Sequence, residues 1–399
     1  MNTENTIEQR DFQAGGVALV SSAHAVHDTY TAYLPALLPV LIEKFSLTNT
    51  LGGLLSVFLQ LPSLLQPVIG RIADRKNLRL FIIFTPAITG IAMSLLSVAP
   101  TYGFLVLLLM IAGISSASLH SVGPVLGSSL SGSKLGRGMS FWMVGDELGR
   151  SLGPIVMVTA IGHLTLDGLP WLMIAGILIS IFLYGKLNSL TTISTEKVAE
   201  VQWKTALLKM RKVMIPITLA IFARALMHAA LGTYLPTFLT NNGASLWVAG
   251  ASLTIFQAAG VAGAFLAGAL SDRFGRRRML LISYIGSPIL MLLFLRTSSI
   301  WQIPLLILLG FFVVSSVPVF MAIVLENAPD NRAFANGVYM AVSFIISSLS
   351  ILIVGMLSDF IDLRFTFMIS AGLLPLGIPI IFLLPKSNVK GSNVEKVEV

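Results

Sequence analysis

Two long apolar segments are separated by the charged stretch Gly268-Ala269-Leu270-Ser271-Asp272-Arg273-Phe274-Gly275-Arg276-Arg277-Arg278. Earlier in the chain, Gly70-Arg71-Ile72-Ala73-Asp74-Arg75-Lys76-Asn77-Leu78-Arg79 repeats the G-x-x-x-D-R pattern, again between two apolar segments. In each copy the glycine permits close packing of two helices, the aspartate can cap a neighbouring helix N-terminus, and the arginines favour the cytoplasmic side of a membrane. The chain is therefore predicted to consist of two related halves.

The composition is that of a membrane protein. Of the 399 residues, 55% are hydrophobic and 11% charged, and the mean hydropathy is +0.87. Apolar runs of roughly 20 residues, long enough to span a bilayer as helices, recur along the chain. The net charge is +8, and the basic residues lie in short loops between these runs. This placement indicates a topological signal and not nucleic-acid binding. The absence of cysteine excludes disulfides.

We predict an all-α polytopic membrane protein with twelve spans, each with an error of several residues at its ends. The spans lie at about 16–42, 50–70, 79–98, 103–129, 138–162, 169–187, 213–240, 247–269, 279–297, 301–326, 333–357 and 365–385. They divide into an N-terminal six-helix bundle at 16–187 and a C-terminal one at 213–385, joined by a linker at 188–212. Most lysines and arginines lie on the side of the tails 1–15 and 386–399, so both termini are predicted to be cytoplasmic.

Two further patterns bear on this organisation. The second part of the linker, Val201 to Lys212, is either an amphipathic helix on the inner leaflet or a solvated connection. Tyr33-Leu34-Pro35 recurs as Tyr234-Leu235-Pro236, and at the same offset His27 corresponds to His228. Such recurrence indicates duplication, and two repeated halves around a central site are typical of secondary transporters.

The loop after the second span of each half resembles the signature G-x-x-x-D-[RK]-x-G-[RK] of the major facilitator superfamily. Asn77 stands where the first copy should have a glycine, and Leu78 where it should have a basic residue. The resemblance implies two pseudo-symmetric six-helix bundles, a central cavity lined by spans 1, 4, 7 and 10, and loops that lock the cytoplasmic side. The matching positions are Gly70, Asp74 and Arg75 in the first copy, and Gly268, Asp272, Arg273, Gly275 and Arg276 in the second.

Within that superfamily the chain resembles the fosmidomycin-resistance efflux branch. The likeness rests on His24-x-x-His27-Asp28, on Leu65-Gln66-Pro67 and on His120. The branch usually has asparagine at the position of His27 and proline at that of Ser121, so substrate identity is not carried over. It also usually lacks the charges of span 5, which are Asp146, Glu147 and Arg150.

Span 5 is similar to the G-x-x-x-G-P pattern of drug–proton antiporters, although Ile155 to Val158 replace its later glycines. The motif residues are Gly145, Gly149, Gly153 and Pro154, and the three glycines, spaced four residues apart, form a flat strip for close helix packing.

Ionisable side chains within the spans are candidate site residues, because each costs at least about 2.5–3.5 kcal/mol at a helix centre. Away from the ends of the spans they lie in spans 1, 4, 5 and 7: His24, His27, Asp28, His120, Asp146, Glu147, Arg150, Arg224 and His228. At 1.5 Å per residue, about the rise of a helix, Asp28, Arg150 and Arg224 lie near mid-membrane and could share a central cavity. The histidines either line this cavity or are hydrogen-bonded packing residues.

The carboxylates are the proton-coupling candidates, since a carboxylate in apolar surroundings can bind and release a proton near neutral pH. Asp28 and Glu147 are preferred, with Asp146 as the third. The alternative is that they neutralise Arg224 or Arg150, and Asp146 lies one helical turn from Arg150.

Arg224 is the main candidate for a substrate-binding residue. With His228 one turn away, it could present donors to a carboxylate, phosphate or phosphonate. An ion pair with Asp28 is the alternative. The further binding candidates are His27, Arg150, His24 and His120.

These features predict a monomeric secondary transporter of the cell (inner) membrane that works by alternating access. Its expected reaction is proton-coupled efflux of a small anionic or amphipathic solute or drug. The alternatives are uptake of an organic anion, proton-coupled or facilitated, and a non-transporting receptor or assembly factor. The sequence has no P-loop or nucleophile motif, so no enzyme and no cofactor are expected. The histidines and acids are too dispersed along the chain to indicate a metal centre.

Overall fold

The computed structural model describes residues 12–66, 68–69, 78–187, 203–328 and 332–385. The described chain is helical, with short 3-10 turns and no strand within these ranges. The predicted tails and most of the linker lie outside the described residues. So does the first signature loop, with Gly70, Asp74 and Arg75.

The first part of the chain covers the first six predicted spans. Its helices are α1 (Ala14–Thr31), α2 (Tyr33–Phe45), α3 (Asn49–Gln60), α5 (Leu78–Ser94), α6 (Tyr102–Ser131), α7 (Leu135–Gly168) and α8 (Met173–Leu187). The 3-10 turns η1 (Leu61–Leu65), η2 (Leu95–Val98), η3 (Gly132–Lys134) and η4 (Leu169–Leu172) join or extend them. The first predicted span is broken between α1 and α2, because Pro35 has no N–H to donate to the carbonyl of Thr31.

Within the described residues, the second part also has seven α-helices, and most of them are longer than 20 residues. They are α9 (Trp203–Asn241), α10 (Leu246–Phe274), α11 (Arg276–Arg296), α12 (Gln302–Glu326), α13 (Arg332–Phe360), α14 (Leu363–Leu373) and α15 (Gly377–Leu383), with the turns η5 (Ser299–Trp301) and η7 (Leu374–Leu376). In the described ranges, nine helical stretches are long and apolar enough to cross a membrane, and one of them, Gly136–Leu187, contains two predicted spans. The described residues of the predicted spans are almost entirely helical, so the prediction of an all-α polytopic membrane protein is confirmed.

Packing contacts group the chain into two compact units. The first unit comprises Met1–Val198 and Leu231–Thr254, and the second comprises Ala199–Ala230 and Ile255–Val399. The boundaries therefore fall inside α9 and α10, and the C-terminal part of α9 and the N-terminal part of α10 belong to the first unit. The predicted bundle limits of 16–187 and 213–385 follow sequence alone and stay a prediction.

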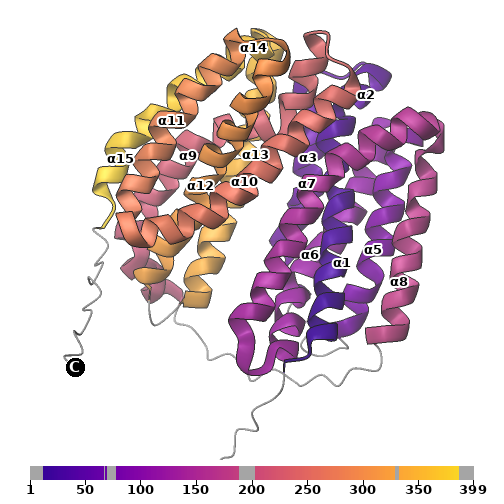
Figure 1. Cartoon of the computed structure of the whole chain (residues 1–399), viewed down its shortest axis with the longest axis horizontal. Coiled ribbons are helices and arrows are strands. Elements are labelled where there is room, and N and C mark those ends of the chain that lie inside the picture. The colour runs from indigo at the N-terminus through magenta and orange to yellow at the C-terminus, as the bar shows by residue number, and fades with distance from the viewer. Residues whose placement is uncertain (1–11, 67, 70–77, 188–202, 329–331, 386–399) are drawn as a thin grey trace, which may run out of the picture. The chain divides into compact units, whose positions relative to one another are not determined.

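Within the first unit, α1 packs along α7, with α5, α6 and α8 beside them (Figure 1). The glycine strip of α7 faces the backbone of α1. A Cβ atom on Gly145 would lie 2.4 Å from the Ser21 carbonyl oxygen, and one on Gly149 would lie 2.3 Å from that of Ala25. Gly153 is equally close to α1. Because this strip has no side chains, the two helices approach closely enough to bring their polar residues together.

Candidate functional site

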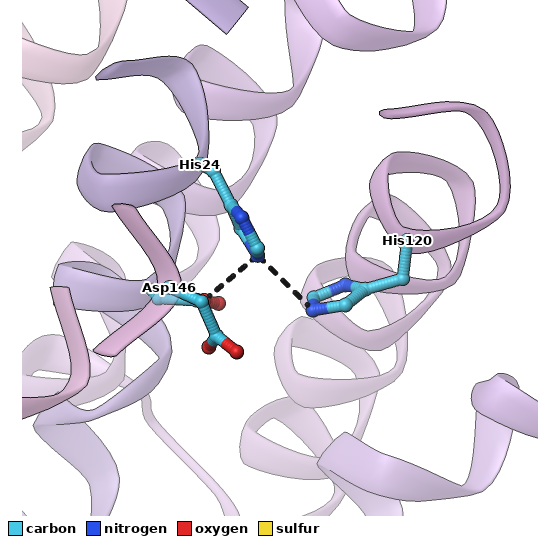
Figure 2. A group of neighbouring side chains, drawn as sticks. His24, His120 and Asp146 are labelled. Carbon is cyan, nitrogen blue, oxygen red and sulfur yellow. Dashed lines mark hydrogen bonds and ion pairs between the residues drawn. The ribbon is translucent and has the colours of Figure 1, made fainter. Parts of the chain in front are cut away.

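Four of the candidate residues meet inside the first unit. His24 and Asp28 come from α1, His120 from α6 and Asp146 from α7, and their side-chain nitrogen and oxygen atoms all lie within 4.8 Å of one another. His24 and Asp28 are buried, whereas His120 and Asp146 are half-buried. Figure 2 shows His24, His120 and Asp146 turned toward a common point. We call these four residues the His–Asp cluster.

His24 is held on both sides of its ring. Its Nδ1 atom donates a hydrogen bond to the carbonyl oxygen of Trp142 at 3.1 Å, and its ring stacks on the Trp142 indole with centroids 3.7 Å apart. Its Nε2 atom lies 3.1 Å from Asp28 Oδ2 and 3.3 Å from Nε2 of His120. The position of His24 is therefore set by α7 as well as by its own helix.

His120 is oriented by its own helix. Its Nδ1 atom donates to the Ser116 carbonyl oxygen at 2.9 Å, so its Nε2 atom faces His24. The ring edge lies against His24, with the two ring planes at 82° and their centroids 5.0 Å apart.

His27 belongs to a separate chain of hydrogen bonds. Its Nδ1 atom lies 2.9 Å from the Thr89 hydroxyl, which donates to the Ser115 hydroxyl at 2.9 Å. Its Nε2 atom lies 3.6 Å from Asp28 Oδ1. Asp28 is thus contacted by two histidines of its own unit, and its predicted ion pair with Arg224 stays a prediction.

The remaining charges of span 5 form a local group. Arg150 Nη2 lies 2.7 Å from Asp146 Oδ2 and 3.3 Å from Glu147 Oε1. Half of the Arg150 side chain is exposed. Arg150 therefore pairs with both neighbouring carboxylates on α7, as the alternative interpretation of these residues expected, and its single positive charge offsets one of their two negative charges.

Arg224 lies on α9, in the second unit. Its Nη1 atom donates to the Val313 carbonyl oxygen of α12 at 3.3 Å, and its Nε atom is buried with no hydrogen-bond acceptor among the described residues. Among the described residues of that unit, no carboxylate lies within ion-pair distance of Arg224. Tyr284 and Tyr339 are close enough to interact with it electrostatically. His228, half-buried, follows one helical turn later.

The second signature loop connects three helices of the second unit. Arg276 Nη2 lies 2.5 Å from Asp272 Oδ1 on α10 and 2.8 Å from Glu326 Oε1 on α12. Gly275, with φ of +95°, makes the turn between α10 and α11 in a conformation that favours glycine. Arg273 lies over the Phe274 ring, and Gly268 has open space beside it. The predicted lock between the bundles stays a prediction.

Three residues of the site were missed in the sequence. Trp142, Thr89 and Glu326 each contact a candidate residue across helices. Thr89 had a local signal, because it is a polar residue in the middle of an apolar span. Trp142 and Glu326 act through contacts with residues that are distant in sequence.

Comparison with known proteins agrees with this architecture. The family model of the Major Facilitator Superfamily matches residues 20–251 and 217–398. The chain is 24% identical over 377 residues to the fosmidomycin resistance protein of Escherichia coli K12, covering 92% of each chain. It is 28% identical over 381 residues to the uncharacterized MFS-type transporter YfnC of Bacillus subtilis 168, again covering 92% of each.

Solved transporter structures share the fold at low sequence identity. A bacterial homologue of the human lysosomal transporter Spinster, in an inward-facing and occupied conformation, is similar with a TM-score of 0.79 and 15% identity. The similarity covers 94% of this chain and 97% of that one. A D-xylose–proton symporter is similar with a TM-score of 0.75 and 17% identity, covering 95% and 99%.

Proposed function

Because the chain belongs to the major facilitator superfamily, a family of membrane transporters, we propose that it exports a small anionic or amphipathic solute in exchange for protons. The protein is a multi-pass membrane protein and a secondary transporter, and the family is not enzymatic. Export by alternating access, a monomeric state, an inner-membrane location and cytoplasmic termini are parts of the proposal.

The single observation that carries the proposal is the environment of Arg224. A guanidinium group within the membrane region is costly unless a negative charge offsets it. Within the described part of its unit, Arg224 has a carbonyl partner and no carboxylate. A planar guanidinium with free donors suits a carboxylate, phosphate or phosphonate, which it can bind through two parallel hydrogen bonds. We therefore propose Arg224 as the anion-binding residue, with His228 beside it.

The direction of transport is supported by the relative from Escherichia coli, which is named for fosmidomycin resistance. Removal of a compound from the cell is how a transporter confers resistance to it. Uptake of an organic anion would use the same guanidinium, so the direction must come from an oriented assay. A receptor that transports nothing is the remaining alternative.

Proteoliposomes with inside-out protein and an acidic lumen test the proposal. The probes are a phosphonate, a phosphate ester, a carboxylate and, for comparison, a cationic drug. Export predicts accumulation of at least one anionic probe that stops when the pH gradient is collapsed. Accumulation confined to right-side-out vesicles with an acidic exterior would identify uptake instead. Absence of flux for every probe would contradict transport of this class.

The variant Arg224→Gln tests the anion site in the same vesicles. We expect the apparent affinity for the anionic probe to fall by about 10- to 100-fold, the size of a lost charge-assisted hydrogen bond. Arg224→Lys keeps the positive charge but loses the planar guanidinium that can donate two parallel hydrogen bonds, so it should recover only part of the affinity. Arg211→Gln, an exposed arginine on the same helix, is the matched control. Equal affinities for Arg224→Gln and the control would overturn the role of Arg224.

A further inference from the structure

We propose that the His–Asp cluster of the first unit binds a divalent transition-metal ion of the zinc class. Its ligands are Nε2 of His24, Nε2 of His120 and one carboxylate oxygen each from Asp28 and Asp146. This inference concerns a resident ion within one unit. It does not depend on the export proposed above.

The first argument is which ring nitrogen carries the proton in each histidine. A carbonyl oxygen only accepts hydrogen bonds, so the nitrogen that contacts it must be the donor. His24 Nδ1 contacts the Trp142 carbonyl and His120 Nδ1 contacts the Ser116 carbonyl. In the neutral rings both Nε2 atoms therefore present lone pairs, and they face each other at 3.3 Å.

The carboxylates add to this concentration of lone pairs. Asp28 Oδ2, which is buried, lies 3.1 Å from His24 Nε2, and Asp146 completes the group within 4.8 Å. Electron-rich atoms so close together repel one another strongly where water is excluded. A cation at their centre removes this repulsion.

A single proton satisfies only part of the group. Placed on His24 Nε2, it can be shared with Asp28, but His120 Nε2 and Asp146 then still lack a donor from within the cluster. A metal ion accepts all four lone pairs at once. Two carboxylates balance the charge of a divalent ion. Of the two Asp146 oxygen atoms, Arg150 contacts Oδ2, which leaves Oδ1 for the ion.

The geometry also fits a metal of this class. Ligand atoms at about 2.0–2.2 Å from a tetrahedral zinc ion lie about 3.3–3.6 Å from one another. The separations of 3.1 Å and 3.3 Å are close to this spacing. The widest pair, at most 4.8 Å apart, would close by up to about 1.2–1.5 Å on binding the ion. Imidazole with carboxylate favours zinc-class ions, whereas Mg²⁺ and Ca²⁺ prefer all-oxygen sites.

The surroundings have the features of a supported metal site. Metal-binding histidines usually donate their outer N–H to a carbonyl or carboxylate, which fixes the ring. Both histidines do so here, and the Trp142 indole stacks on one of them. The half-buried His120 and Asp146 leave a way in for the ion. The site joins α1, α6 and α7, so an ion would hold these helices together.

This proposal assigns Asp28 and Asp146, two of the predicted proton-coupling residues, to the metal ion. The dispersal of these residues along the sequence had argued against a metal centre. Their convergence from three helices is what changes that interpretation.

Metal binding is measured on the full-length protein in detergent with the purification tag removed, since polyhistidine binds the same ions. We expect the wild-type protein to bind one Zn²⁺ per chain in equilibrium dialysis, with Mg²⁺ and Ca²⁺ failing to compete. Co²⁺ should give the intense visible absorption of a tetrahedral site, which Zn²⁺ then abolishes. Zn²⁺ should also raise the thermal unfolding temperature, because it binds the folded state.

The variants His120→Gln and Asp146→Asn remove one half-buried ligand each. We expect each to weaken Zn²⁺ binding by more than about 100-fold, beyond the effect of losing a second-shell contact. The matched controls are His163→Asn, an exposed histidine of α7, and Glu147→Gln, the neighbour of Asp146. Size-exclusion profiles establish that each variant is folded. The proposal is overturned if the wild type binds neither Zn²⁺ nor Co²⁺, or if both ligand variants bind them as the controls do.

Discussion

The Nε2 atoms of His24 and His120 lie 3.3 Å apart, although the two residues are separated by 96 positions along the chain. Each ring uses its other nitrogen to hold a backbone carbonyl oxygen. In their neutral forms the two rings therefore meet through their lone pairs, and the carboxylates of Asp28 and Asp146 join them. This arrangement belongs to the first unit, whereas Arg224 belongs to the second.

The hydroxyl of Thr89 should be important for the stability of the first unit. Thr89 is fully buried and connects His27 Nδ1 with the Ser115 hydroxyl. Thr89→Val keeps the shape but leaves the imidazole nitrogen without a partner, so we expect a loss of about 1–3 kcal/mol in unfolding free energy. Thr89→Ser keeps the hydroxyl and should lose clearly less. Thermal unfolding in detergent compares the two, and equal losses would show that the methyl group matters instead.

Gly149 should tolerate no larger side chain. A Cβ atom there would lie 2.3 Å from the Ala25 carbonyl oxygen and 2.9 Å from Asp28 Cβ. We expect Gly149→Ala to push α7 from α1 and to destabilise the protein by about 1–3 kcal/mol. Gly162→Ala is the control, because on the same helix it meets nothing within 4 Å. The contact would be less tight than described if both variants unfolded at the wild-type temperature.

Gly275 should be required for the turn between α10 and α11. Its φ of +95° is strained for any residue with a Cβ atom, and no atom stands in the way of the side chain itself. Gly275→Ala should therefore cost about 1–3 kcal/mol through the backbone alone. Gly268→Ala, in the same signature and also beside open space, should cost less because its backbone is helical. Thermal unfolding of the two variants separates backbone strain from side-chain clash.

Arg276 and Glu326 should be energetically coupled. They join α11 to α12 at 2.8 Å, and Asp272 approaches the same guanidinium nitrogen. Since the Glu326 side chain is 40% exposed, we expect a coupling of only about 0.2–1 kcal/mol. A double-mutant cycle of Arg276→Gln and Glu326→Gln, measured by unfolding at low and high salt, checks it. Additive effects at low salt would exclude the coupling.

Much of the fold could be predicted from local patterns. Within the described ranges, the apolar runs of the sequence located the helices, because hydrophobic length is what a bilayer selects. The four-residue spacing of Asp146 and Arg150 placed them on one face of a helix, where they pair. The break in the first span was not foreseen as a helix boundary, although Pro35 is its local cause.

The sequence by itself determined the class of protein, the helical spans and the residue pairs one turn apart, because hydropathy and the helical period act over short stretches of chain. Only the tertiary structure decided that His24, His120 and Asp146 converge, that Trp142 stacks on His24 and that Glu326 pairs with Arg276. These contacts depend on which helix faces meet. That choice results from packing between distant segments, such as the glycine strip of α7 against α1, which no local pattern specifies.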